Sequence, residues 1–371
     1  MPTANNEMKH LDALRIIAAS AVVVLHYADY FKELVVGCFL VSHVWHFNLF
    51  VDLFFVVSGY VIASQYLGRV ESPAAVGRFL WRRLARIYPL HLATLTFYVM
   101  IALVAHLGVA SGDNPARYPF SDLPAQLLLL HAFDGARLTF NFPSWSLSAE
   151  MFCYLLFPIM AVVAVSRRHW ILTLVIAAAT ANSVWAALAG TTPWADWINQ
   201  GGAFRAVPAF ALGVACHLYR DRLAQAPAIP GALVVALIAF MAFGWLLSPM
   251  GALAAVYAVA LLAIQADCSG RATLVSTLHL DRWSPLTYSC YMLHIPVATV
   301  VISFGARLLH LDASAGKLIL APLAVVVLAA ASVASLRWFE TPLRRALTEA
   351  YDRRFARPAV ASPLARQEAL R

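Results

Sequence analysis

Long apolar runs separated by short polar or basic stretches dominate this sequence, and they restrict its fold more than any other feature. Residues 231–247 and 321–336 are two clear examples. Such runs approach the roughly 20 residues that a helix needs to cross about 30 Å of hydrocarbon. Hydrophobic residues make up 61% of the chain and charged residues 12%, whereas soluble domains have about 45–50% and about 25%. Because a lone span must satisfy its backbone hydrogen bonds internally, the sequence predicts an all-α, polytopic integral membrane protein.

The hydropathy pattern predicts about ten transmembrane helices. The sixth and eighth are short enough to tilt or break. Residues 122–133 are too short to span, and we expect them to form an interfacial or re-entrant piece. The predicted spans are residues 14–30, 47–66, 88–109, 144–166, 171–189, 205–219, 229–247, 250–266, 286–308 and 317–337.

The distribution of Lys and Arg predicts the orientation of these helices, because cytoplasmic loops carry an excess of positive charge. With the N- and C-termini inside, about 21 of the 27 Lys and Arg residues lie on the cytoplasmic side, which leaves about 6 outside. We expect residues 1–345 to form the membrane-embedded domain. Residues 346–371 would form a basic cytoplasmic tail that lies on anionic membrane lipids or is disordered. No zinc spacing or Arg/aromatic repeat indicates nucleic-acid binding, despite a net charge of +8.

Arg15 and His26 are two ionisable residues in the first predicted span. At about 100° per residue, their separation amounts to about three turns plus 20°, so both lie on one helix face, about 16 Å apart along the axis. Arg15 would lie at the cytoplasmic end and His26 deep in the outer half. Arg15 has an ordinary interpretation as a topology anchor. For His26 we favour a functional role, since ionisable groups buried in membranes are usually functional.

Three further ionisable residues interrupt apolar spans. Asp52 either caps the start of its helix or takes part in chemistry. Glu150 lies about 10 Å inside the outer boundary, at the depth of His26, so the two are candidates for a base and its orienting carboxylate. His294 falls near mid-membrane. We predict His26, Glu150, Asp52 and His294 as the catalytic group.

Four arginines and no lysine occur in the first nine residues of "RFLWRRLARIYPLH", residues 78–91. Arginines that anchor a helix at the interface would look similar, but the planar guanidinium suits bidentate contacts to phosphate. Glu340, at the inner end of the tenth span, either joins this cluster or forms a local salt bridge of little energetic value. The predicted contacts to a phosphate-bearing ligand from the cytoplasm are Arg15, Arg82, Arg83 and Arg86.

Seven segments, in this order, resemble the acyltransferase-3 family of integral membrane acyltransferases, and the resemblance extends from Leu11 to Arg345. Phe50, Cys153 and Met292 depart from the family's usual glycine, aromatic residue and leucine, but none of these changes removes an ionisable group. The segments are "LDALRIIAASAVVVLH", "FFVVSGY", "RRLARIYP", "WSLSAEMFCYLLFP", "FRAVPAFALGV", "YSCYMLHIPV" and "FETPLRR".

The resemblance implies a membrane O-acyltransferase that moves an acyl group, usually acetyl, from cytoplasmic acyl-CoA to a hydroxyl. The implied acceptors are sugars of exopolysaccharide, lipopolysaccharide or lipid-linked glycans, and the implied location is the bacterial inner membrane. A thioester is already activated, so we expect no metal. His26 suits a general base near neutral pH, and Glu150 or Asp52 would orient it. The four arginines, with Glu340, would hold the CoA.

Two alternatives remain open. The acceptor would be a small secondary metabolite such as a macrolide, or the chain would be a proton-coupled transporter or flippase whose intramembrane His, Asp and Glu relay protons. Because the chain ends soon after the tenth span, we expect either direct transfer to the acceptor or transfer through a separate extracytoplasmic acyl-accepting protein.

Overall fold

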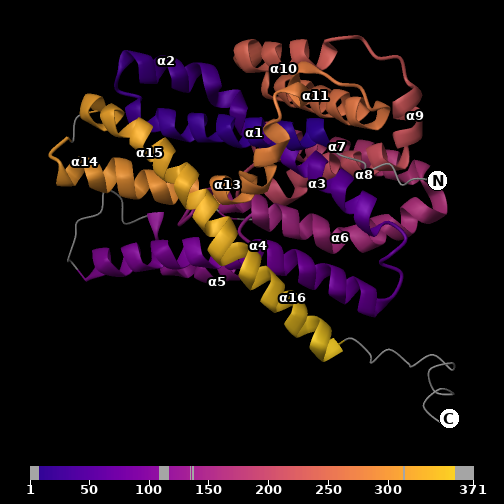
Figure 1. The fold of residues 1–371 in the computed structure, drawn as a ribbon, viewed down its shortest axis with the longest axis horizontal. Helices are drawn as coiled ribbons and strands as arrows, with labels where there is room; N and C mark the ends of the chain where they lie inside the picture. The colour runs from indigo at the N-terminus through magenta and orange to yellow at the C-terminus, as the bar shows by residue number, and fades with distance from the viewer. Residues whose placement is uncertain (1–7, 108–116, 134, 136–137, 312–313, 356–371) are drawn as a thin grey trace.

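The computed structural model describes residues 8–107, 117–133, 135, 138–311 and 314–355. It is 84% helical, and no strand occurs among the described residues, which confirms the predicted fold class. Most of the long helices lie side by side, while α15 and α16 cross them diagonally (Figure 1). The helices are α1 (Lys9–Ala28), α2 (Val35–Val44), α3 (Phe50–Tyr66), α4 (Pro73–His106), α5 (Leu123–Leu127), α6 (Trp145–Arg167), α7 (His169–Ala189), α8 (Gly202–Leu218), α9 (Arg220–Gln225), α10 (Ala232–Phe243), α11 (Pro249–Ser269), α12 (Leu274–Thr277), α13 (Thr287–Ala298), α14 (Gly305–Leu308), α15 (Ser314–Ala334) and α16 (Thr341–Phe355).

Each of the ten predicted spans coincides with an apolar helix. Eight helical stretches of the described residues are long and apolar enough to cross a membrane, and two apolar helices, Gly202–Leu218 and Ala232–Leu246, are shorter. The sixth predicted span, Gly202–Leu218, is short, as expected. The prediction that the eighth is short was wrong, because Pro249–Ser269 is a continuous helix of 21 residues. The second short helix is instead the seventh span, Ala232–Leu246. The orientation and the exact number of crossings remain predictions.

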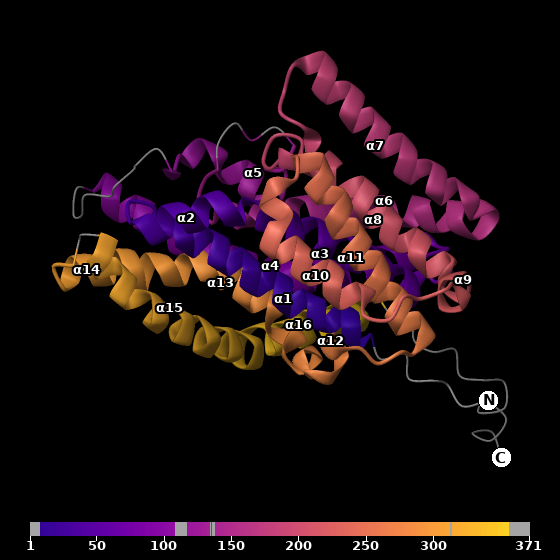
Figure 2. The ribbon, with the colours of Figure 1, turned by 90° about the horizontal axis from the view of Figure 1, so that it is seen from above.

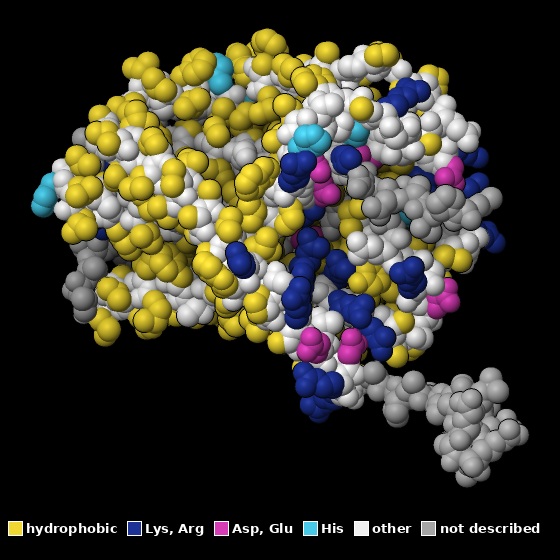
Figure 3. Space-filling view, in the orientation of Figure 1, with side chains coloured by type: hydrophobic (Ala, Val, Ile, Leu, Met, Phe, Trp, Pro, Cys, Tyr) yellow, Lys and Arg dark blue, Asp and Glu magenta, His cyan; other side chains and the backbone are white. Residues whose placement is uncertain are grey.

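The surface of the bundle has two distinct parts. Hydrophobic side chains cover most of the left side in Figure 3, whereas Lys and Arg side chains gather at the lower right, over the region of α4 and α16. The peripheral helix α7 (Figure 2) exposes large apolar residues such as Ile176 and Trp185. Exposed apolar surface of this extent is unfavourable in water. It fits helices that face lipid, with the basic end outside the hydrocarbon.

Helix α4 positions the predicted arginine cluster. It begins at Pro73, where the side chain of Ser72 accepts a hydrogen bond from the backbone N–H of Ala75, and proline is favoured in the first turn because its missing N–H costs nothing there. Its 34 residues extend about 50 Å, which exceeds the hydrocarbon thickness of about 30 Å. The helix is therefore longer than the apolar layer is thick, which agrees with the predicted position of its arginine-bearing turns at the cytoplasmic edge.

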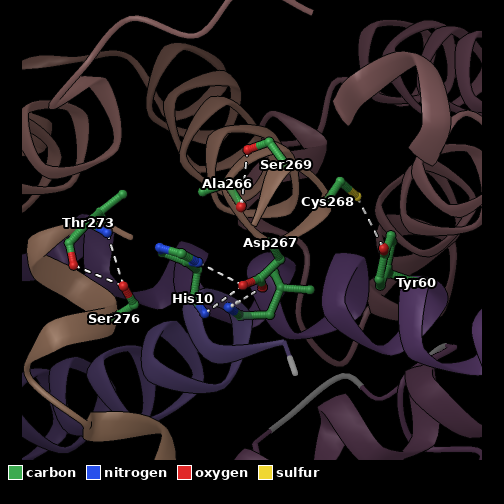
Figure 4. Close-up of polar contacts among 9 residues, drawn as sticks. His10, Tyr60, Ala266, Asp267, Cys268, Ser269, Thr273 and Ser276 are labelled. Atoms are coloured by element: carbon green, nitrogen blue, oxygen red, sulfur yellow. Dashed lines mark hydrogen bonds and ion pairs between the residues drawn. The ribbon is translucent and has the colours of Figure 1, made fainter. Parts of the chain in front are cut away.

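Asp267 at the end of α11 fixes the start of α1 (Figure 4). Its carboxylate accepts hydrogen bonds from the backbone N–H groups of His10 at 2.9 Å and Leu11 at 3.0 Å, and from Nδ1 of His10 at 2.7 Å. The first N–H groups of a helix have no partner within the helix, and a carboxylate there also interacts favourably with the helix dipole. This contact sets the height of α1, and with it the heights of Arg15 and His26.

Two glycines allow α3 and α8 to pack closely. A methyl group on Gly59 would lie 2.0 Å from the carbonyl oxygen of Phe210, and one on Gly213 would lie 2.0 Å from that of Val56. Small residues allow backbones in a membrane to approach this closely, and packing of this kind drives helix association there.

The predicted tail is in part an ordered helix. Residues 346–355 belong to α16, which packs on α4: the indole N–H of Trp81 donates to the carbonyl of Leu347 at 2.9 Å, and the ring of Tyr351 stacks on Trp81. Aromatic contacts, which sequence periodicity did not indicate, hold α16 in place. Residues 356–371 lie outside the described residues.

We expect Gly213→Ala to destabilise the protein more than Gly305→Ala. At Gly213 the new methyl group overlaps backbone atoms, so α3 and α8 must separate. At Gly305 its nearest neighbours are at 3.6 and 3.7 Å, which is ordinary contact, and alanine favours helix over glycine by about 1 kcal/mol. The measurement is the thermal unfolding midpoint of each purified variant in detergent. Equal midpoints for the two variants would contradict the close contact.

Candidate active site

A central cavity of about 820 Å³, including the part open to solvent, lies between α1, α3, α4, α6 and α13. Much of its wall is apolar, and the polar side chains that line it come from all five helices. They are Arg15, Ser58, Arg83, Arg86, Ser146, Glu150, Tyr154, Thr287, Tyr288 and Tyr291. The cavity thus joins three of the predicted phosphate-binding arginines to the predicted catalytic glutamate.

Arg15 is held at the cavity wall by two groups. Its Nη1 donates to Oδ1 of Asp12 at 3.1 Å and to Oγ of Ser284 at 3.0 Å, and Ser284 also donates to Asp12 at 2.7 Å. A guanidinium has five N–H donors, and these contacts use one nitrogen. The remaining donors are available to an anionic ligand.

Two of the three predicted α4 arginines reach the central cavity. Arg83 is buried, donates to the hydroxyl of Tyr66 at 2.9 Å and lies over that ring. Arg83 and Arg86 line the central cavity. Arg82 does not line this cavity; it lies 3.5 Å from Asp352 of α16 and lines a second pocket beside that helix. The structure therefore brings Arg15 together with two of the three predicted α4 arginines.

Glu150 is hydrogen-bonded to hydroxyl groups inside the cavity. Its Oε1 accepts from Oγ of Ser58 at 2.7 Å and from the hydroxyl of Tyr154. We expected Glu150 to orient His26, but no hydrogen bond joins the two among the residues that the structure describes. Ser58 precedes Gly59, and a small residue at such a position commonly serves helix packing; here its hydroxyl also binds the carboxylate of Glu150.

His26 and His294 form a pair beyond the cavity. Their rings stack with centroids 5.2 Å apart, and the edge of Phe142 closes the other side of His26. Nδ1 of His294 lies 2.6 Å from the carbonyl oxygen of Tyr291. A carbonyl only accepts hydrogen bonds, so Nδ1 carries the proton and Nε2 presents a lone pair. That Nε2 is buried and has no hydrogen-bond partner among the described residues.

One aromatic side chain separates the cavity from the histidine pair. Tyr291 lines the cavity, and its ring centroid lies 5.8 Å from that of His294. Its hydroxyl donates to the carbonyl of Pro143 at 2.9 Å and accepts from Oγ of Ser146 at 2.8 Å. These two bonds hold the ring between the arginine-lined space and the imidazoles.

Asp52 has a different partner from the one expected. It forms an ion pair with Arg205 of α8, at 2.5 Å between Oδ2 and Nη2, and the two side chains are 0% and 1% exposed. Arg205 also donates to the carbonyl of Trp197 and lies over the ring of Trp145. Charges buried so completely require a partner. Asp52 therefore joins α3 to α8, and the described contacts do not place it beside His26.

Glu340 also differs from the expectation. It lies in a π-helix, η10 (Ser335–Glu340), and its Oε1 accepts hydrogen bonds from Ser289 and Ser335, each at 2.6 Å. It lines neither of the two hollows described above. Glu340 thus joins η10 to α13, and the described contacts do not place it beside the predicted phosphate-binding arginines of the cavity.

Sequence reasoning missed a second histidine pair near the cavity. The rings of His91 and His131 stack with centroids 5.9 Å apart, and Nε2 of His131 is hydrogen-bonded to Oγ of Ser144 at 3.1 Å. Burial, followed by the proximity of His91, lowers the pKa of His131 to about 4, so its ring is neutral at pH 7. The only indication of this pair in the sequence was His131, an ionisable residue in the short apolar segment 122–133.

Comparisons with known proteins point to acyl transfer. A family model for an acyltransferase domain matches residues 8–337. The protein named acyltransferase MdmB of Streptomyces mycarofaciens is 30% identical over 367 aligned residues, which cover 89% of this chain and 90% of that protein. Protein 2 in the picA locus of Rhizobium radiobacter is 30% identical over 154 residues, 38% of this chain and 75% of that protein. No solved structure matches.

We expect Asp52→Asn to lower the free energy of unfolding by about 3–5 kcal/mol, because removal of one member of a buried ion pair leaves the other charge uncompensated. Arg205→Gln should have a similar effect, and the double variant should lose less than the sum. Asp221→Asn is the control, since Asp221 is exposed at 3.8 Å from Arg220. Denaturant unfolding in mixed micelles measures all four, and a control as unstable as Asp52→Asn would refute the assignment.

Proposed function

This chain belongs to the acyltransferase family whose model matches it, and we propose that it transfers an acyl group, normally acetyl, from acyl-CoA to a hydroxyl of a second substrate. Its apolar helices make it a multi-pass membrane acyltransferase. The CoA thioester enters from the basic end of the bundle, which is cytoplasmic in the predicted orientation. The hydroxyl acceptor approaches the histidine pair from the other side.

One observation supports this proposal above the others: the central cavity carries three arginines and comes within one side chain of two stacked histidines. Arginines suit phosphate through charge and bidentate geometry, and CoA is an acyl carrier rich in phosphate. Imidazole suits proton transfer near neutral pH. An arginine-lined cavity that is separated from the imidazoles by the Tyr291 side chain suits a long donor whose charged and reactive ends lie far apart.

The side chains have separable tasks in this reaction. A CoA thioester supplies an acyl carbon that is already activated. Arg15, Arg83 and Arg86 hold its phosphates. His26 takes the proton from the acceptor hydroxyl, and His294 stacks on His26 and holds its ring in place. Ser58 and Tyr154 keep the Glu150 carboxylate in a fixed orientation within the cavity, where its negative charge lies among the arginines.

The acceptor is a sugar hydroxyl of an exopolysaccharide, a lipopolysaccharide or a lipid-linked glycan. The second candidate is a small secondary metabolite. The match to a Streptomyces protein named as an acyltransferase, over 89% of this chain, supports acyl transfer to either acceptor. Acylation of either acceptor is the same type of reaction, because in each case a hydroxyl reacts with an activated thioester and a base must take its proton.

Deletion of the gene should remove one acyl group from a single class of product. We expect mass spectrometry of surface glycans and secreted metabolites to show loss of the mass of one acetyl group per modified unit, restored by the wild-type gene. Unchanged glycans and metabolites would contradict both acceptors. If purified protein moves a glycan across proteoliposome membranes and releases no CoA, the transporter alternative would hold instead.

We expect His26→Ala to lower kcat about 10²–10⁴-fold, the usual contribution of a general base. The affinity for acyl-CoA should change little, because His26 does not line the arginine-bearing cavity. His169→Ala is the matched control, since His169 is an exposed histidine at the start of α7. CoA release with the identified acceptor gives kcat, and titration calorimetry gives the affinity. Normal turnover of His26→Ala at normal membrane levels would refute the assignment.

A further inference from the structure

A second pocket of about 940 Å³, here called the arginine pocket, lies between α4 and α16. Five arginines from these two helices line it, together with one acidic residue, Glu349. In Figure 3 the dark blue side chains gather over this part of the molecule. The arginines of the pocket are Arg82, Arg83, Arg86, Arg344 and Arg345.

Aromatic and ionic contacts hold α16 against α4 despite this like charge. Trp81 donates to the carbonyl of Leu347 and stacks on Tyr351 with ring centroids 5.6 Å apart. Asp352 lies 3.5 Å from both Arg78 and Arg82. These contacts lie along α16 on the C-terminal side of Arg344 and Arg345. They fix α16 in a position in which Arg344 and Arg345 share one pocket with the three α4 arginines.

Five guanidinium groups around one pocket repel one another unless an anion lies between them. With one glutamate, the lining has a formal charge of +4. Arg344 and Arg345 are exposed, and their planar donors suit phosphate oxygens in pairs. The chemistry of the pocket therefore selects a ligand with several phosphate charges.

The arginine pocket adjoins the central cavity, because Arg83 and Arg86 line both. A ligand with phosphates in the arginine pocket would have to pass these two side chains to reach Ser58 and Glu150. The head group of a phospholipid would meet the same arginines. It lacks an acyl thioester to place in the inner cavity, so the adjoining cavity favours the donor.

We propose that Arg344 and Arg345 bind phosphate groups at the nucleotide end of the acyl-CoA donor, so that the enzyme selects donors with a ribose 3′-phosphate. The inference rests on the proposed function. CoA carries a diphosphate and a phosphomonoester, together about four negative charges near pH 7, which matches the formal charge of the pocket lining.

The test compares acetyl-CoA with acetyl-dephospho-CoA in the full-length enzyme, in nanodiscs of phosphatidylcholine. We expect the wild type to have a KM for acetyl-CoA at least about tenfold below that for the dephospho donor, since a charge-assisted hydrogen bond contributes this much or more. In the double variant Arg344→Ala/Arg345→Ala this preference should disappear, with kcat little changed.

The matched control is Arg353→Ala/Arg354→Ala, which removes the same charge from α16 at exposed positions outside the arginine pocket. The control should keep the wild-type donor preference. If the Arg344/Arg345 variant also kept it, or if the KM for both donors rose equally, the proposed phosphate contact would be wrong. If the variant differed from the wild type only in nanodiscs that contain phosphatidylglycerol, the pocket would bind lipid and the inference would again be wrong.

Binding of adenosine 3′,5′-bisphosphate to the purified chain separates this inference from the proposed function, because it needs no turnover. We expect calorimetry to show binding to the wild type and a loss of at least about tenfold in affinity in the Arg344/Arg345 variant. Binding without any acyl transfer would refute the proposed function and leave the pocket assignment standing. Acyl transfer with equal binding by variant and wild type would refute the pocket assignment alone.

Discussion

The contact between α3 and α8 determines how the rest of the site is arranged. The buried Asp52–Arg205 ion pair and the close backbone approach at Gly59 lie on the same face of α3, because seven residues amount to nearly two full turns. Ser58 is six residues from Asp52, which rotates it by about 120° away from that face. The contact with α8 thus directs Ser58 toward Glu150 and the central cavity. A rotation of α3 would separate an intramembrane ion pair, and the cost of that separation holds the cavity wall in place.

The ionisable groups are separated along the cavity. Arg15, Arg83 and Arg86 line the space that adjoins the arginine pocket, whereas His26 and His294 lie behind Tyr291. An arginine beside the imidazoles would disfavour their protonation, and a general base must accept a proton during turnover. In the proposed reaction, this separation would let the arginines hold phosphate by positive charge while a base stays available for proton transfer.

The sequence predicted which segments are membrane helices but not which charged side chains meet. Each of the ten predicted segments coincides with an apolar helix, because a span must be both apolar and long, although two of these helices are shorter than the other eight. The predicted depth of each residue was enough to place Arg15 and Arg86 in one site. Depth could not predict the partner of Asp52, because it does not show which way each helix faces. A rotation of about 100°, one residue, exchanges the groups that touch. Arg205 was a charge in an apolar helix, and it could have been proposed as the partner of an acidic residue on a neighbouring helix.

Hydrogen bonds and ion pairs within the protein account for the burial of Asp52 and Glu340, but not for that of His294. Asp52 and Arg205 satisfy one another in full exclusion from solvent, and Glu340 is bonded to two serines, so their burial needs no ligand. Nε2 of His294 has no hydrogen-bond partner among the described residues, and the arginine pocket has far more positive than negative charge. A membrane protein keeps such costly groups where they act on a substrate. The lining of the central cavity includes Tyr291, whose ring lies beside His294, and Arg83 and Arg86, which also line the arginine pocket. The proposed transfer from a phosphate-bearing donor to a hydroxyl would use both groups.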